Sequence, residues 1–321
     1  MQSHASSMST SPAGARSPIV VATDLSEAAS IAVEGAARLT RRQNADLHVL
    51  HVFDDGIWAT LKNLYDTQHW SGEDPVLGTR RRLSELAADI AHRHGIRVLA
   101  ESEAGDPAEA IVRFASQRGA RLVVIGKDGD DWLSDTLFGE TALELLQTTD
   151  VPVMIVRRGQ AQPARRVLVA VDFSACSHRA ARLACELFHE AEITLLNAYS
   201  VRHEGRMRIG GASDDDIAAY LLSQQVRAEA AMRRLSSALD NEKCCRTVTV
   251  NRSAASAILD EAATGFDVLV VGIFLDPESV AIYFAAAKTM ALVHFVFFSV
   301  KAAAAQAVQV VTGADGHALG H

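Results

Sequence analysis

The sequence predicts an α/β fold built from two tandem, doubly wound open parallel sheets of five strands each. Short apolar runs rich in β-branched residues alternate with segments of helical periodicity, and this alternation is typical of parallel strands joined by right-handed crossover helices. Because the runs are apolar at nearly every position, we expect both faces of each sheet to be covered. The same series of patterns then occurs twice along the chain.

The first copy follows a segment rich in Ser, Ala and Gly. Its first strand is predicted over residues 18–23 and is broken by Asp24-Leu25-Ser26, where Ser26 and the acidic Glu27 favour the start of a helix. A variable-looking insert occupies residues 54–78. The other predicted strands are 47–53, 96–101, 122–125 and 153–156, and the other predicted helices are 80–94, 108–118 and one that starts near Gly139.

The second copy begins at Arg165. Residues 167–174 repeat residues 19–26 after 148 positions, and residues 267–272 repeat residues 121–126 after 146 positions. The two spacings between repeated segments differ by only two residues, which indicates a tandem duplication. The predicted organisation is a disordered N-terminal tail over residues 1–17, domain 1 over 18–158, a linker over 159–165, domain 2 over 166–301 and a C-terminal tail over 302–321.

Composition narrows the class of protein. The 321 residues are 49% hydrophobic and 22% charged, which is enough for a normal core. The formal net charge of -8 argues against a nucleic-acid binder, which needs a basic face. The four cysteines form no CxxC pair, and residues 1–17 contain no apolar signal-peptide core. These features predict a cytoplasmic protein with reduced thiols.

The apolar segment 280–300 is long enough to cross a membrane. It also contains Lys288 and His294, and it falls where the second copy needs its last helix and its fifth strand. We therefore expect no membrane insertion. The segment is instead predicted to form a buried helix over 285–294 and an edge strand over 295–300.

A glycine pattern follows the fourth strand of the first copy. Gly126 ends the apolar run, and Gly129, Gly139 and Thr141 complete the spacing G-x2-G-x9-G-x-T. Glycines at the end of a buried strand and at the start of a helix let backbone N–H groups approach an anion closely. The pattern predicts a phosphate cradle, although an ordinary glycine-rich turn without a ligand is the alternative.

The V-x-x-D-x-S start, this glycine loop and the order of strands and helices resemble the universal stress protein family in its tandem form. The resemblance is strong over residues 18–157 and weaker over 165–301. It implies adenine nucleotide alpha hydrolase-like sheets with strand order 3-2-1-4-5. In that order, the first and fourth strands meet where the winding direction reverses, and ligands bind outside the carboxyl ends of such strands. We therefore expect Asp24 and Gly126 to line one crevice.

Family members that bind nucleotides hold ATP in this crevice, and the resemblance assigns one group of residues to the base. Ala22, Thr23 and Asp24 are expected at the adenine end, where the Asp24 carboxylate accepts a hydrogen bond from the exocyclic amine. Val52, near the end of the second strand, is expected to pack on the base.

The resemblance assigns a second group to the sugar and phosphates. Ile125 and Gly126 are expected under the ribose. Gly129 and Gly139 let backbone N–H groups reach the phosphates, and Thr141 adds a hydroxyl.

The first copy departs from the family pattern at Glu140, which stands where the family usually has a small hydroxyl residue. Like charges ~4 Å apart near a protein surface cost about 4 kcal/mol, which exceeds the ~0.3–1 kcal/mol that a helix terminus offers an anion. The carboxylates could instead face solvent or help to hold Mg²⁺ with the phosphates. The acidic residues of the loop are Asp128, Asp130, Asp131, Asp135 and Glu140, against Lys127 alone.

The second copy keeps Asp172 and Ser174 but loses the glycines, so its backbone cannot approach a pyrophosphate in the same way. We expect no ATP binding there by the family mode. Domain 2 is instead predicted to supply, within the chain, the partner surface that single-domain members obtain by dimerising. The replacements are Gly105 by Arg252, Gly129 by Leu275 and Gly139 by Ala285.

These observations lead to a stress-response protein that binds ATP or a related adenine nucleotide in domain 1 without efficient turnover. No general base or catalytic triad is visible at the strand ends. The alternative is a nucleotide-free scaffold that acts through protein contacts, and a slow ATP hydrolase is a third hypothesis. The sequence leaves open whether two chains form a homodimer.

Overall fold

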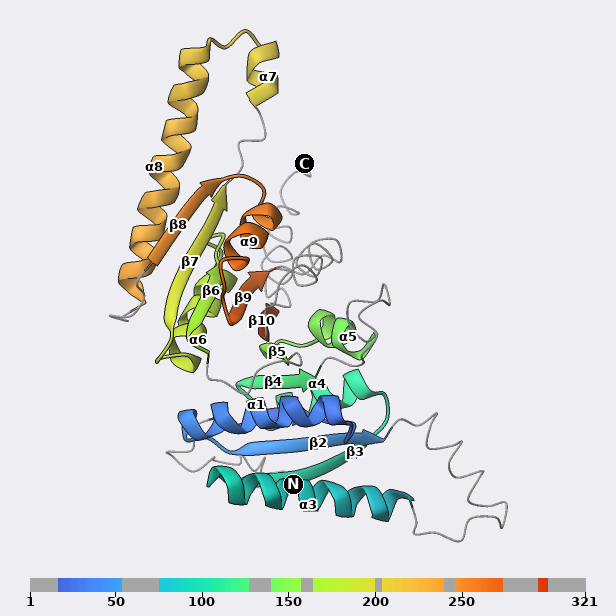
Figure 1. Ribbon diagram of the computed structural model, residues 1–321. Helices are drawn as coiled ribbons and strands as arrows, with labels where there is room; N and C mark the ends of the chain where they lie inside the picture. The colour runs from blue at the N-terminus through green and yellow to red at the C-terminus, as the bar shows by residue number, and fades with distance from the viewer. Residues whose placement is uncertain are drawn as a thin grey trace, which may run out of the picture.

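The computed structural model describes residues 17–53, 75–126, 140–156, 164–199, 204–239, 246–273 and 294–299. These residues form one ten-stranded sheet with helices on both faces (Figure 1). Most strands are short apolar runs, as the sequence pattern predicts, whereas the two border strands, Val98–Ala104 and Arg246–Asn251, include polar residues. Each half of the chain supplies five of the ten strands.

The first half alternates strands and helices in the predicted order. Its described strands are β1 (Ile19–Ala22), β2 (Leu47–Phe53), β3 (Val98–Ala104), β4 (Leu122–Gly126) and β5 (Val153–Val156). Its described helices are α1 (Glu27–Gln43), α3 (Pro75–His94), α4 (Pro107–Gln117) and α5 (Glu140–Thr148). Ser26 caps α1, as expected, and Asp106 caps α4.

The second half repeats the series. Its described strands are β6 (Arg166–Ala170), β7 (Glu192–Tyr199), β8 (Arg246–Asn251), β9 (Val268–Ile273) and β10 (His294–Ser299). Its described helices are α6 (Ala175–Leu187), α7 (Glu204–Ile209), α8 (Asp214–Ala238) and α9 (Ala254–Ala262).

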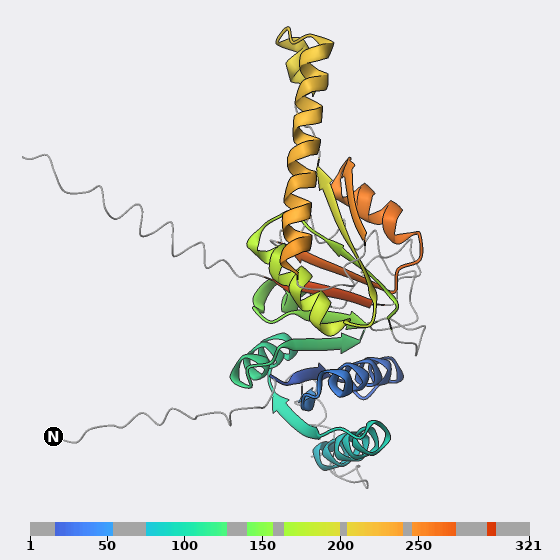
Figure 2. The same ribbon diagram turned by 90° about the vertical axis from the view of Figure 1, so that its left-hand side faces the viewer.

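The strand order is β3-β2-β1-β4-β5 in the first half and β8-β7-β6-β9-β10 in the second, so both halves have the expected order 3-2-1-4-5. Within each half, every neighbouring pair is parallel. The halves join where β5 pairs with β10 in the antiparallel direction, with Ile155 opposite Phe295. Figure 2 shows the sheet twisting continuously across this junction.

The prediction of an edge strand over 295–300 is therefore wrong. β10 lies between β9 and β5 in the interior of the sheet. The reason is long-range pairing. β5 and β10 are the last strands of their halves, and because they pair with each other, neither of them lies at an edge of the sheet. A strand whose two faces are covered by helices needs apolar residues at successive positions, and the run FVFF in β10 matches this requirement because α6 and α5 contact β10 from opposite faces.

Each face of the sheet has its own hydrophobic layer. Ile19 and Val21 belong to the layer that includes residues of α1, α3, α6 and α8, whereas Val20 belongs to the layer that includes residues of α4, α5 and α9. Both layers contain residues from the two halves, so the core continues across the junction. Among the described helices, none is long and apolar enough to cross a membrane.

Candidate functional site

The two strands that flank the point of reversal end side by side. β1 pairs with β2 on one side and β4 on the other, and Val21 lies opposite Val124. Thr23 and Asp24, which follow β1, therefore lie at the same edge of the sheet as Gly126, the last residue of β4. This is the edge where ligands bind in doubly wound folds.

A small apolar surface lies at this edge. Ala22, Val52 and Ile125 come from the ends of β1, β2 and β4 and belong to or pack on the same hydrophobic layer. Ala22 and Val52 are half-buried, whereas Ile125 is 6% exposed. Their side chains share a face because each stands at the same parity along its strand. The structure thus brings together three of the apolar residues that the sequence assigned to the site.

Asp24 is held by the turn that starts α1. Its Oδ1 accepts a hydrogen bond from the Ser26 backbone N–H at 2.9 Å, and Ser26 Oγ accepts one from Ala29 N–H at 3.1 Å. Between them, Leu25 adopts a left-handed backbone with φ of 65°, which is unusual for a residue other than glycine. Asp24 is exposed, and its Oδ2 has no hydrogen-bond partner within the described part of the chain.

The second half builds the same turn. Asp172 Oδ1 accepts from Ser174 N–H at 2.9 Å, Ser174 Oγ accepts from Ser177 N–H at 3.2 Å, and Phe173 has a φ of 64°. Burial alone would raise the pKa of Asp172, but the hydrogen bonds from Ser174 and Ser177 outweigh it and hold that pKa below its usual value. The D-x-S motif therefore has a structural role in both halves.

His51 is a crevice residue that the sequence did not single out for this role. Its Nδ1 lies 2.8 Å from the carbonyl oxygen of Thr23. Because a carbonyl can only accept, Nδ1 must carry the hydrogen and donate it. In the second half, Asn197 Nδ2 donates to Val171 O at 2.8 Å in the equivalent position. His51 and Asn197 occupy equivalent positions, 146 residues apart, in the two copies. Both side chains can donate a hydrogen bond, and this shared property is the feature of the sequence that could have identified the contact.

The turn before α4 differs between the halves. Gly105 adopts a φ of 125°, which side-chain-bearing residues rarely adopt, and its N–H donates to Phe53 O at 3.1 Å. Arg252 stands at the corresponding position in the second half, where it pairs with Asp260. The turn of the second half thus carries the ion pair of Arg252 and Asp260, whereas the turn of the first half has a glycine without a side chain.

The remaining predicted site residues lie further along the chain. Glu140 is the first residue of α5, and Thr141 next to it is half-buried. Gly129, Gly139 and the aspartates of the loop, which are Asp128, Asp130, Asp131 and Asp135, lie outside the described residues. Within the described ranges, no three His, Cys, Asp or Glu side chains gather to hold a metal ion.

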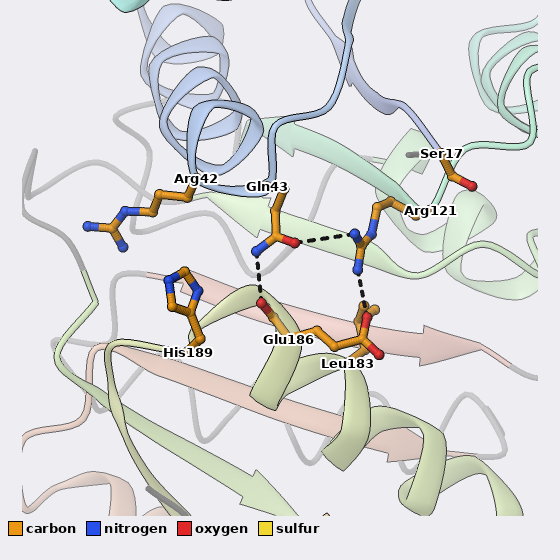
Figure 3. Close-up of a pocket in the computed structure, with 7 residues that line it drawn as sticks. All are labelled: Ser17, Arg42, Gln43, Arg121, Leu183, Glu186 and His189. Atoms are coloured by element: carbon orange, nitrogen blue, oxygen red, sulfur yellow. Dashed lines mark hydrogen bonds and ion pairs between the residues drawn. The ribbon is translucent and has the colours of Figure 1, made fainter. Parts of the chain in front are cut away.

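A polar hollow lies at the junction of the halves, away from the crevice (Figure 3). Its volume is about 790 Å³, and Arg121, Gln43 and Glu186 connect its walls. Arg121 donates to Glu186 Oε2 at 2.8 Å and to Gln43 Oε1 at 3.3 Å, and Gln43 Nε2 donates to Glu186 O at 2.8 Å. These three residues form an interdomain clamp. The other residues that line the hollow are Ser17, Arg42, Leu183 and His189.

Comparison with known proteins identifies the family. The model of the universal stress protein family matches residues 16–157 and again residues 163–274. The chain belongs to the universal stress protein family. Because the two matches follow one another along the chain, this is a tandem universal stress protein.

Curated relatives match one half of the chain. Universal stress protein YxiE of Bacillus subtilis is 28% identical over 144 residues, which is 43% of this chain and 97% of that protein. Universal stress protein MJ0531 of Methanocaldococcus jannaschii is 24% identical over 149 residues, which is 44% of this chain and 81% of that protein.

A solved structure has the fold of the whole tandem. A universal stress protein from Archaeoglobus fulgidus aligns with a TM-score of 0.61 at 18% identity, over 88% of this chain and 98% of the other. At this identity the likeness shows the fold alone.

Proposed function

We propose that this tandem universal stress protein is a cytoplasmic stress-response protein that binds an adenine nucleotide in domain 1 without efficient turnover. The observation that carries the proposal is the edge formed by the ends of β1, β2 and β4. There, Ala22, Val52 and Ile125 share one face, and Asp24 stands exposed beside them. An apolar surface with a few polar groups is typical of a small-molecule site.

The base is bound by the residues at the end of β1 and β2. Ala22 and Val52 offer apolar contact to one face of adenine. Asp24 Oδ1 is already occupied by the turn, so Oδ2 is the oxygen that accepts the exocyclic amine. An exposed carboxylate that is fixed by a turn needs little reordering on binding, which favours affinity.

The phosphates fit the start of α5. The first N–H groups of a helix have no partner within the helix and attract anions. Because the first residue of α5 is the acidic Glu140, the nucleotide binds as its Mg²⁺ complex, in which the cation offsets repulsion between like charges. The same residue is the argument for the alternative function, a nucleotide-free scaffold.

Slow turnover follows from the way the titratable groups of the crevice are held. A hydrolase must position a group that takes a proton from water. Asp24 is engaged by Ser26, and His51 Nδ1 donates to Thr23 O. Neither group is poised to act as a base on the phosphate end, since both belong to the end of β1 and β2.

Domain 2 serves as the built-in partner. It keeps the Asp172 turn but carries Arg252, paired with Asp260, in place of Gly105. Its β10 pairs with β5, which covers the edge of the domain 1 sheet. Domain 2 thus stabilises domain 1 and does not bind a nucleotide in the same mode.

The test is a thermal shift of the full chain with ATP and Mg²⁺, using a matched pair of variants. Asp24→Asn keeps the acceptor that the turn needs but replaces Oδ2 by an amide donor, which cannot accept from the base. Asp172→Asn makes the same change in domain 2. Saturation at 100-fold over Kd adds ~2.7 kcal/mol, which corresponds to a rise in Tm of roughly 4 °C for a chain of 321 residues.

We expect the shift in the wild type and in Asp172→Asn but not in Asp24→Asn. No shift in the wild type, together with a shift gained by Glu140→Ser, would support the scaffold instead. If Asp24→Asn and Asp172→Asn lost the thermal shift equally, damage to the turn, and not loss of the contact with the base, would be the cause. Release of phosphate that depends on Asp24 would favour the hydrolase.

A further inference from the structure

Helix α8 is the most protruding element of the described chain. It has 25 residues and so is ~37 Å long. Its C-terminal part lies on β7 and β8, whereas its N-terminal part extends beyond the sheet beside α7 (Figures 1 and 2). Its start is fixed by a capping box in which Ser213 and Asp216 bond to each other's backbone N–H.

One face of α8 is buried and the opposite face is apolar at its centre. Ile217, Ala228, Met232 and Leu235 form the buried face. At 100° per residue, Leu222 and Val226 lie on the far side, where they are 61% and 51% exposed. Single exposed apolar residues are ordinary, but two on adjacent turns form a surface.

Exposed apolar residues concentrate on the α7–α8 hairpin. Within the described ranges, the large apolar side chains classed as exposed are Leu77, Ile209, Leu222 and Val226, and three of these four belong to α7 or α8. Ile209, at the end of α7, is 90% exposed. The hairpin is therefore the apolar surface of the described chain that a partner would cover.

The charges on the same face of α8 are arranged symmetrically about the apolar pair. Asp215 lies seven residues before Leu222, and Arg233 lies seven residues after Val226. Seven residues are nearly two helical turns, so all four side chains lie in one row. Asp215 and Arg233 are both exposed. The row reads acid, apolar, apolar, base, which is complementary to itself when a second copy runs in the opposite direction.

The charges also select a register. When Leu222 opposes Val226 of a second copy, Asp215 opposes Arg233 at both ends of the contact. When Leu222 opposes its own copy, Asp215 meets Glu229, which is repulsive. When Val226 opposes its own copy, Arg233 meets Ala219 and the charge pair is lost.

We propose that α8 is a self-association surface, on which a second copy of this chain docks antiparallel with Leu222 against Val226 and Asp215 against Arg233. This inference is independent of nucleotide binding. A helix ~37 Å long and ~10 Å wide covers about 400 Å² per partner, which is below the ~800 Å² of a stable dimer. The dimer is therefore weak and forms reversibly with concentration.

The test is sedimentation velocity of the full chain over a series of concentrations. The wild type should shift from monomer to dimer as the concentration rises, and the shift should weaken with salt. Val226→Glu should abolish it, and this substitution keeps the helix because Glu is the better helix former. Leu77→Glu, at the 57% exposed position on α3, is the matched control and should leave the dimer unchanged.

A charge exchange tests the register. Asp215→Arg alone should weaken association at least tenfold, because two cations then face each other twice, and Asp215→Arg combined with Arg233→Asp should restore it. Restoration would exclude a mere loss of helix stability, since the second change adds no helical support. A wild type that stays monomeric at every concentration overturns the proposal. A dimer that persists in Val226→Glu also overturns the proposal. So does the finding that α8 binds another protein more tightly than it binds a second copy of this chain.

Discussion

Replacing Arg121 by alanine is expected to loosen the two halves of the chain from each other. The Arg121 side chain is 17% exposed; it donates to Glu186 across the junction and to Gln43 within the first half. Hydrogen bonds between charged groups contribute about 1.5–3 kcal/mol when buried, and exposed ion pairs contribute about 0–1 kcal/mol. Because Glu186 is 53% exposed, we expect Arg121→Ala to lower the free energy of unfolding by ~1–2 kcal/mol.

The chain provides its own probes for this experiment. All three tryptophans, at positions 58, 70 and 132, lie outside the described residues, so hydrogen exchange of the backbone amides of α4 is the probe of domain 1. Far-UV circular dichroism reports on helices of both halves. In urea, the two transitions should coincide for the wild type and separate for Arg121→Ala, because domains that share a core unfold together only while their junction holds.

The matched control is Arg97→Ala. Arg97 forms an ion pair with Asp46 at 3.0 Å within domain 1, but its side chain is 70% exposed, so the loss should stay below ~0.5 kcal/mol. Glu186→Ala completes a double-mutant cycle, in which the coupling with Arg121 should be about 1 kcal/mol. Equal losses for Arg121→Ala and Arg97→Ala, with coincident transitions in both, would refute the view that the clamp couples the halves.

Three further predictions concern the core, the pH dependence and α8. Phe114 is 3% exposed and packs on His48, so Phe114→Ala should lower the free energy of unfolding, measured in urea, by ~3–5 kcal/mol. Burial, and then the Arg118 charge, lower the pKa of His48 against the opposing effect of Glu101. The unfolded chain therefore binds the proton more readily, so the free energy of unfolding should fall as the pH drops below ~6.5, and it should fall less in His48→Leu. Ser213→Ala removes the cap of α8 and should lower stability by ~1 kcal/mol, measured as a shift of the urea midpoint.

Most strands were predictable because they are apolar runs bounded by polar or glycine residues, whereas β3 and β8, at the borders of the sheet, include polar residues. β2 and β5 match the predicted ranges, whereas β3 extends to Ala104, three residues beyond the prediction, because its pairing with β2 continues to Phe53. α3 begins at Pro75, where proline fits the first turn of a helix. The position of β10 was missed because pairing between the edges of two halves is a long-range contact that no local pattern encodes.

The edge of the sheet at which Asp24 and Gly126 meet was predictable from the sequence, but the hydrogen bonds at this edge were not. The repeat and the strand order bring Asp24 and Gly126 to one edge. The contact between His51 and Thr23 depends on the register of β1 and β2, which becomes visible only in three dimensions. The clamp was missed for the same reason, since Arg121 and Glu186 come from different halves.

The duplication separates what the family motif does for the fold from what it does for a ligand. Asp24 and Asp172 hold the same turn, with φ values of 65° and 64° at the next residue, so the aspartate alone does not mark a nucleotide site. The halves differ instead in their glycines, as the exchange of Gly105 for Arg252 shows. If domain 1 alone binds a nucleotide, the bare backbone is what permits it, and the turn is scaffolding that both halves need.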